Sequence, residues 1–126
     1  MIRTALLFCL IANGVLACPA TPDALALQAQ AEAPSAYITM DPPAISQPRS
    51  AQIEFCTDLS MADLSFNAIM PAHQHGMNYE VTVEKIAPGT FDIENIVFHM
   101  PGLWEIQVEA ISGSTSFPYT AEVMVE

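Results

Sequence analysis

The amino-acid sequence predicts an all-β protein, an antiparallel immunoglobulin-like β-sandwich of about six to seven strands. From Arg49 onward, apolar residues alternate with polar residues in short runs, as they do in strands with one buried and one solvated face. Short groups of turn-forming residues separate these runs. They are Pro88-Gly89, Pro101-Gly102 and Ser112-Gly113-Ser114.

The expected strands follow one another through residues 49–126, which we assign to one sandwich domain. The alternating runs are 52–57, 64–68, 79–84, 91–94, 96–100, 104–110 and 117–125. Tyr79 and Trp104 fall on the apolar faces of their runs, and Trp104 is expected to be the central aromatic residue of the core. The alternation changes phase after Asn95, which marks a break between two neighbouring runs.

The first 17 residues have the features of a secretory signal peptide, so we expect residues 1–17 to be removed on export. Arg3 supplies a positive charge, and the apolar run after it is too short to span a bilayer. Loss of Arg3 would change the net charge from −11 to 2 − 14 = −12. We therefore expect the protein in the periplasm or on a membrane surface of a bacterial envelope.

Cys18 has two chemically exclusive uses. Val15-Leu16-Ala17-Cys18 resembles the bacterial lipobox, in which the cysteine is acylated and becomes the N-terminus of a lipoprotein on the inner or outer membrane. The other use is a disulfide with Cys56, because these two cysteines remain once Cys9 has left with the signal peptide.

Residues 18–48 are rich in proline and alanine, and we expect them to form a tether that holds the sandwich away from the membrane. Within this segment, residues 23–32 have the composition of a short helix, although such a length is marginal in water. Residues 37–40 could instead begin the domain as an edge strand that stops at Pro42.

The composition argues against several classes of function. Three Lys and Arg residues stand against fourteen Asp and Glu residues. Such an acidic surface repels nucleic acid and anionic lipid headgroups, whereas it is compatible with cation binding. We do not expect an enzyme, because Ser60 and Ser65 lie in no nucleophile motif and no Gly-rich phosphate loop is present. Two neighbouring histidines are also too few for a hydrolytic zinc site.

One segment gathers most of the side chains that can bind a soft metal. Residues 70–77, Met-Pro-Ala-His-Gln-His-Gly-Met, hold two of the three histidines and two of the seven methionines. Because residues i and i+2 of an extended chain point the same way, His73 and His75 can approach one ion. Thioether sulfur from Met70 and Met77 favours Cu(I) over hard cations. The alternative is a solvated loop whose methionines fill the core.

His99 and Met100 form a second candidate region. If the alternation continues through residues 96–100, Met100 points toward the core and His99 points outward to solvent. Met100 would complete the metal site if the turn at 101–102 lay beside residues 70–77. Otherwise, Met100 simply ends a strand.

Together, the two regions resemble the YtkA-like family of small exported bacterial domains, which is related to the FixH-like family. The resemblance covers about residues 50–126. It is carried by Met70, Pro71, His73, His75, Gly76 and Met77, then by Phe98, Met100, Pro101, Gly102 and Trp104. It implies an immunoglobulin-like domain and, for some relatives, a link to copper handling or oxidase assembly. FixH-like proteins are inserted in the membrane, whereas no long apolar segment follows the expected signal peptide here.

These observations lead to one hypothesis and one alternative. The hypothesis is an exported, lipid-anchored copper-binding module for periplasmic metal buffering or delivery, with Cu(I) favoured as the bound ion. Its expected ligands are Met70, His73, His75, Met77 and Met100. The alternative is a metal-free β-sandwich that docks on a protein partner in the cell envelope.

Overall fold

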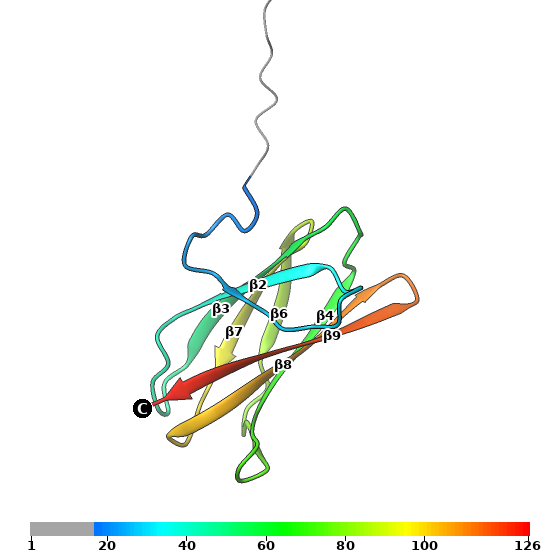
Figure 1. Ribbon diagram of the computed structural model, residues 1–126. Coiled ribbons are helices and arrows are strands. Elements are labelled where there is room, and N and C mark those ends of the chain that lie inside the picture. The colour runs from blue at the N-terminus through cyan, green and yellow to red at the C-terminus, as the bar shows by residue number, and fades with distance from the viewer. Residues whose placement is uncertain (1–16) are drawn as a thin grey trace, which may run out of the picture.

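A computed structural model describes residues 17–126, which form two antiparallel sheets that face each other (Figure 1). Within this range the chain contains nine strands and no helix. The strands are β1 (Leu25–Ala26), β2 (Ser35–Met40), β3 (Arg49–Cys56), β4 (Asp63–Met70), β5 (His75–Gly76), β6 (Thr82–Ala87), β7 (Thr90–Ile96), β8 (Gly102–Ser112) and β9 (Thr115–Val125). The predicted all-β sandwich is confirmed.

The order of the strands is that of an immunoglobulin-like sandwich. One sheet has the order β1-β2-β3-β7-β6 and the other has the order β5-β4-β8-β9. The seven longer strands are β2, β3, β4, β6, β7, β8 and β9. In the immunoglobulin fold, the first, second, fifth and fourth of the seven strands form one sheet and the other three form its partner, and β2-β3-β7-β6 has this order. Two of the nine strands, β1 and β5, contain only two residues each. The seven longer strands match the expected number.

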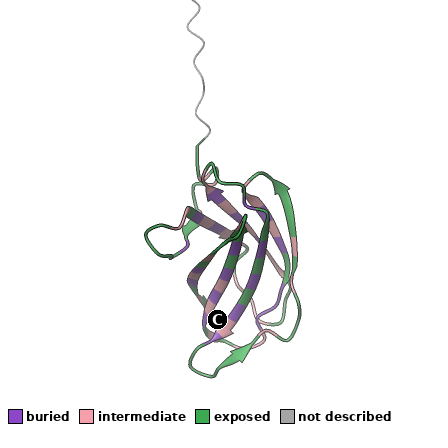
Figure 2. Ribbon diagram, turned by 90° about the vertical axis from the view of Figure 1, so that its right-hand side faces the viewer, coloured by how far each residue is buried: buried purple, intermediate pink, exposed green. Residues whose placement is uncertain are grey.

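The core lies between the two sheets, where the apolar faces of the strands meet. Buried and exposed residues alternate along these strands (Figure 2). Trp104 is fully buried, as predicted, and its ring centre lies 5.3 Å from that of Phe98. In contrast, Tyr79 is 61% exposed, so its predicted place on a buried face was wrong. The reason is that β6 begins at Thr82, so no strand fixes the direction of the Tyr79 side chain.

The predicted change of phase after Asn95 has a clear backbone origin. Asn95 adopts a φ of 67°, a left-handed conformation that asparagine tolerates better than most residues. One residue later β7 ends, and Ile96, Val97 and Phe98 are then all buried in succession. The turn at Pro88-Gly89 is also confirmed, since it joins β6 to β7.

The sandwich begins earlier than residue 49, inside the segment that we assigned to a tether, and the strand considered for residues 37–40 is present as part of β2. Strand β2 pairs along its whole length with β3, and Ala36 and Ile38 are only 2% and 4% exposed. The hydroxyl of Tyr119 donates a hydrogen bond to the carbonyl oxygen of Pro34 at 2.7 Å. Burial raises the pKa of this tyrosine, which favours the protonated hydroxyl that makes the bond.

The short helix considered for residues 23–32 is absent, because this stretch pairs with strands of both sheets. Strand β1 pairs with β2, and two residues later Gln28 forms an isolated bridge with Thr120 of β9. The backbone N–H groups of Gln28 and Thr120 each donate to the other residue's carbonyl, at 2.8 and 2.9 Å. Helix propensity over ten residues is weak, so pairing with existing strands prevails.

The predicted signal peptide, residues 1–17, lies outside the described residues except for Ala17. In residues 17–126, no helix has the length and apolar character needed to cross a membrane.

Replacement of Ile38 by alanine should test whether β2 belongs to the folded domain. Ile38 is 4% exposed, and loss of a buried isoleucine side chain costs about 2–5 kcal/mol of unfolding free energy. Thr39→Ala, at the next position on the other face, is the matched control and should cost much less. Urea unfolding followed by Trp104 fluorescence measures both variants. Equal stability of Ile38→Ala and the unchanged chain would show that the segment is a free tether.

Candidate metal centre

Residues 70–77 lie at one end of the sandwich, where β4 turns back into β5. Met70 is the last residue of β4, and it pairs with His75 of β5. The backbone N–H of His73 donates to the carbonyl oxygen of Met70 at 3.2 Å, which closes the turn between them. Figure 1 shows this green segment at the lower end of the molecule, the end at which β8 begins and β9 finishes.

The pairing of the strands arranges His75, Met70 and Trp104 in one row across the four-stranded sheet. Ile69 pairs with Glu105, so one step further along the same ladder Met70 lies beside Trp104. Residues directly opposite each other in a ladder point to the same face of the sheet. Met70 and Trp104 are buried, at 1% and 0% exposure, whereas His75 is exposed at the edge of the row.

The two histidine rings of the turn lie close to each other. The ring centres of His73 and His75 are 6.3 Å apart, with an angle of 30° between the ring planes. Two imidazoles that bind one ion through bonds of about 2.0–2.1 Å have ring centres no more than about 6.5 Å apart. The separation is therefore at the upper limit for a shared ion, and both side chains are exposed and free to rotate toward it.

Met70 and Gly102 bring the two regions singled out from the sequence into contact. A Cβ atom built at Gly102 would lie 2.8 Å from the terminal methyl carbon of Met70. Gly102 also adopts a φ of +130°, a backbone conformation that other residues rarely adopt. The glycine is thus needed both for the turn into β8 and for the close approach of the methionine. The 101–102 turn therefore lies beside the end of β4.

Met77 and Met100 have different neighbours. Met77 lines an open groove together with Phe66, Asn67 and Tyr79, so it lies beside the middle of β4. Met100 accepts a hydrogen bond at its carbonyl oxygen from the indole nitrogen of Trp104, at 3.0 Å. Both methionine side chains are partly buried and pack against the core. The contacts thus join Met70 to His75 and His73 to His75. The contacts described for Met77 and Met100 are with other residues.

His99 was expected to point into solvent, and the structure places it differently. Its ring centre lies 5.4 Å from that of Trp104, with the two rings nearly perpendicular. Its Nδ1 atom is buried and has no hydrogen-bond partner. Alternation could not reveal this position, because β7 ends at Ile96 and no strand continues through residues 97–100. His99 is therefore a third imidazole at the same end of the sandwich.

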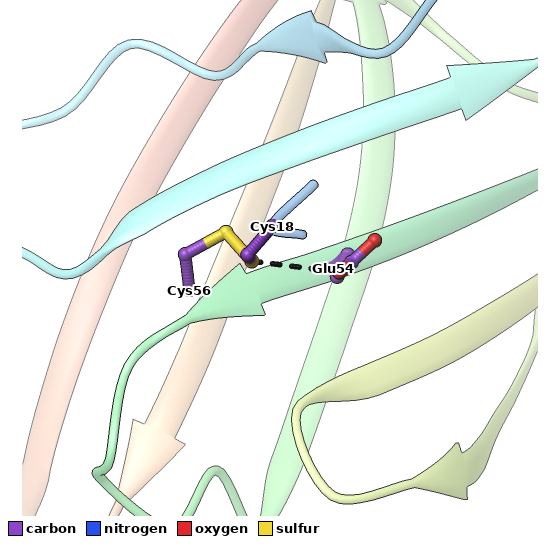
Figure 3. A group of neighbouring side chains, drawn as sticks. All are labelled: Cys18, Glu54 and Cys56. Carbon is purple, nitrogen blue, oxygen red and sulfur yellow. Dashed lines mark hydrogen bonds between the residues drawn. A yellow bond between two sulfur atoms is a disulfide. The ribbon is translucent and has the colours of Figure 1, made fainter. Parts of the chain in front are cut away.

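A separate group of side chains lies on the outer face of the other sheet. Cys18 and Cys56 form a disulfide, with 5.8 Å between their Cα atoms (Figure 3). One carboxylate oxygen of Glu54 lies 3.4 Å from the Cys18 sulfur, a contact without a shared proton because a disulfide sulfur carries no hydrogen. Both oxygens of Glu54 accept the backbone N–H of Ala20, at 3.2 and 3.0 Å.

The disulfide decides between the two expected uses of Cys18 in this structure. Acylation needs the same sulfur atom that is here bonded to Cys56, so a chain in this state is not modified at Cys18. Within residues 17–126, Cys18, Glu54 and Cys56 are the one group of three His, Cys, Asp or Glu side chains close enough to share an ion. As long as the disulfide holds, its sulfurs are not thiolate ligands.

The fold and its chemistry define a small immunoglobulin-like sandwich domain with histidine and methionine side chains at one end. A family model described as YtkA-like matches residues 36–109, which is more than half of the chain. The chain belongs to the YtkA-like family, and the resemblance seen in the sequence is confirmed. The match begins in β2, consistent with the early start of the sandwich.

Comparison with other known proteins adds support for the fold. No curated protein matches the chain. Among solved structures, the chain is similar to the crystal structure of a DUF4785 family protein from Legionella pneumophila, with a TM-score of 0.53 and 10% sequence identity. The similarity covers 71% of this chain but 27% of the Legionella protein, so the chain corresponds to about a quarter of that protein's length.

Replacement of Gly102 by alanine should destabilise the domain. The φ of +130° and the approach of the Met70 methyl carbon both oppose a side chain there, and such strain costs about 1–3 kcal/mol. Gly76→Ala is the matched control, because nothing lies within 4 Å of a Cβ atom at that position. Chemical unfolding of the two variants provides the comparison. If Gly102→Ala were no less stable than Gly76→Ala, the contact between the two regions would be unimportant.

Proposed function

We propose that this protein is an exported copper-binding domain that buffers or delivers metal in the bacterial envelope. The observation that carries the proposal is the row formed by His75, Met70 and Trp104, which joins the histidine turn to the region that contains Met100. Imidazole nitrogen and thioether sulfur together favour copper, and thioethers favour Cu(I) over Mg²⁺, Ca²⁺ or Mn²⁺.

In this proposal His73 and His75 are the primary ligands. Their ring separation of 6.3 Å is at the upper limit for a shared ion, and rotation of the two exposed side chains brings both nitrogens to it. Met77 and Met100 supply sulfur when their flexible side chains turn toward the rings. Met70 is buried, so it limits the site on the core side and offers its sulfur only to an ion held at that boundary.

The acidic composition fits this role, because fourteen Asp and Glu residues against three Lys and Arg residues raise the local concentration of cations. Export supplies the compartment: a disulfide such as Cys18–Cys56 persists where conditions are oxidising. In such a compartment thioethers are useful copper ligands, since they do not form disulfides as thiols do.

A second candidate function is a metal-free module that docks on an envelope protein. The observation in its favour is an apolar pair on the outer face of the four-stranded sheet. Leu103 and Met124 pair across β8 and β9, and they are 41% and 56% exposed. Exposed apolar side chains of this kind can contribute to a protein interface, although one pair is small compared with known interfaces.

Copper titration of the purified chain tests the first proposal directly. We expect one Cu(I) per chain in competition with a chromophoric Cu(I) chelator. The double variant His73→Ala/His75→Ala should bind at least about tenfold more weakly, which corresponds to about 1.4 kcal/mol. Gln74→Asn is the matched control, because it changes the residue between the histidines without removing a ligand and keeps a residue type that tolerates its φ of 52°.

The contribution of the methionines can be separated from that of the histidines in the same assay. Met77→Leu and Met100→Leu retain most of the packing volume but remove the sulfur. Each should weaken Cu(I) binding and leave Cu(II) binding nearly unchanged, because a thioether is a soft ligand. Equal Cu(I) affinity for the histidine double variant and the unchanged chain would refute the copper site.

Growth of a deletion strain across a range of copper concentrations distinguishes the two functions. If the protein buffers copper, the deletion strain should grow poorly at high or limiting copper. The unchanged gene should then restore growth, and the His73→Ala/His75→Ala gene should not. A docking module predicts that growth is indifferent to copper, and that Leu103→Ser/Met124→Ser abolishes partner capture while the histidine double variant retains it.

A further inference from the structure

A second candidate metal site lies at the opposite end of the sandwich, and the proposed copper site makes no use of it. Cys18, Glu54 and Cys56 each offer one ligand atom, and these three atoms lie within 4.8 Å of one another. Glu54 and Cys56 are two residues apart on β3, so both point to the outer face of their sheet, away from the core. The N-terminal segment brings Cys18 onto the same face (Figure 3).

The group is accessible without unfolding of the domain. It borders an open hollow on the surface, which is also lined by Thr57 and Asp58. Cys18 is exposed, and Glu54 and Cys56 are half-buried. Glu54 is held in place because its two oxygens accept the N–H of Ala20, so the carboxylate is already fixed beside the sulfurs.

We infer that the Cys18–Cys56 disulfide is a redox gate on a binding site for a thiophilic divalent cation such as Zn²⁺. In the oxidised chain, both sulfurs are committed to each other and no thiolate is present. In the reduced chain, the two thiols lose their protons when the cation binds, and the two thiolates and the Glu54 carboxylate then form a set of three ligands with one open coordination position. Zinc accepts sulfur and carboxylate oxygen in such combinations.

The opening reaction requires a dithiol reductant, the class of molecule that reduces protein disulfides. The dithiol gives two electrons and two protons; the bond between the Cys18 and Cys56 sulfurs breaks, each sulfur gains one proton, and the dithiol becomes a disulfide. Binding of the cation then displaces both thiol protons to the solvent. Reduction therefore exchanges a covalent link between the N-terminal segment and β3 for a link through the metal.

Geometry supports one ion between these residues. The Cα atoms of the two cysteines are 5.8 Å apart, so their sulfurs can separate by rotation of the side chains without movement of the backbone. One Glu54 oxygen lies 3.4 Å from the Cys18 sulfur. This is close to the separation of about 3.5–4 Å between neighbouring ligands of one tetrahedral ion with metal–sulfur bonds of about 2.3 Å, and the two sulfurs can reach that separation once their bond has broken. The three ligands carry three negative charges, which the cation offsets in part.

Cobalt(II) is the probe for the test, since tetrahedral cobalt bound to thiolate absorbs light strongly in the near ultraviolet. The purified chain with His73→Ala/His75→Ala is used, so that the histidine turn cannot bind the metal. Cobalt binding is measured for the oxidised chain and for the reduced chain. The reduced chain is prepared with dithiothreitol, which is then removed under oxygen-free conditions. We expect one cobalt per reduced chain with a sulfur charge-transfer band, displacement by Zn²⁺, and no such band in the oxidised chain.

Two variants in the same histidine background identify the ligands. Cys56→Ser should abolish the charge-transfer band of the bound ion, because one thiolate cannot hold it. Glu54→Gln leaves both cysteines intact and should weaken cobalt binding at least about tenfold. Glu122→Gln, the same change on the outer face of the other sheet, is the matched control and should bind cobalt as tightly as the parent chain.

Three results would overturn the inference. The first is a reduced chain that shows no thiolate band with cobalt, and the second is a Glu54→Gln chain that binds cobalt as tightly as its parent. The third is a change of Trp104 fluorescence on reduction to that of a solvent-exposed tryptophan, which would show that the domain unfolds. The site requires the folded sandwich to hold Glu54 beside Cys56. None of these results bears on the proposed copper site, because the tested chain lacks both histidines of that site.

Discussion

The pairing of β4 with β8 is the constraint on which the proposed copper site depends. These two strands are the central pair of the four-stranded sheet, and their register fixes which residues meet at its end. Because Ile69 pairs with Glu105, Met70 comes to lie beside Trp104, and the two-residue strand β5 then carries His75 to the same row. A shift of one residue would turn Met70 to the outer face and separate the turn from the core.

Much of the sandwich could be predicted from the sequence, because period-two alternation reports directly which face of a strand is buried. Trp104 was correctly assigned to the core for this reason, and the break at Asn95 was visible as a change of phase. In the N-terminal part, only residues 37–40 were considered as a strand, and the rest was assigned to a tether. Its strand β2 is short and followed by prolines, and β1 has only two residues, so neither gives a periodic signal. Their pairing depends on β3 and β9, which are distant in the sequence.

In the candidate metal centres, too, some features could be predicted from the sequence and others depend on the fold. The histidine turn was found because its ligands are neighbours in the chain, and a local pattern reveals local chemistry. The contact of Met70 with Gly102 depends on the register of two strands, and the position of His99 depends on the loop after β7. The group of Cys18, Glu54 and Cys56 joins residues 38 positions apart, and only the fold brings them together. No local pattern connects Glu54 with the cysteines.

The attachment of the N-terminal segment has a geometric consequence for the whole molecule. Cys18 is bonded to the residue that ends β3, whereas Arg49, which begins β3, pairs with Ile96 at the end of β7. The eight residues of β3 span about 25 Å, so the point of attachment lies about that far from the other end of β3. Figure 1 shows the N-terminal segment entering at the upper end and the turn after β4 at the lower end. The disulfide and the imidazoles therefore lie at opposite ends of the sandwich, so an event at one of them leaves the other open to solvent.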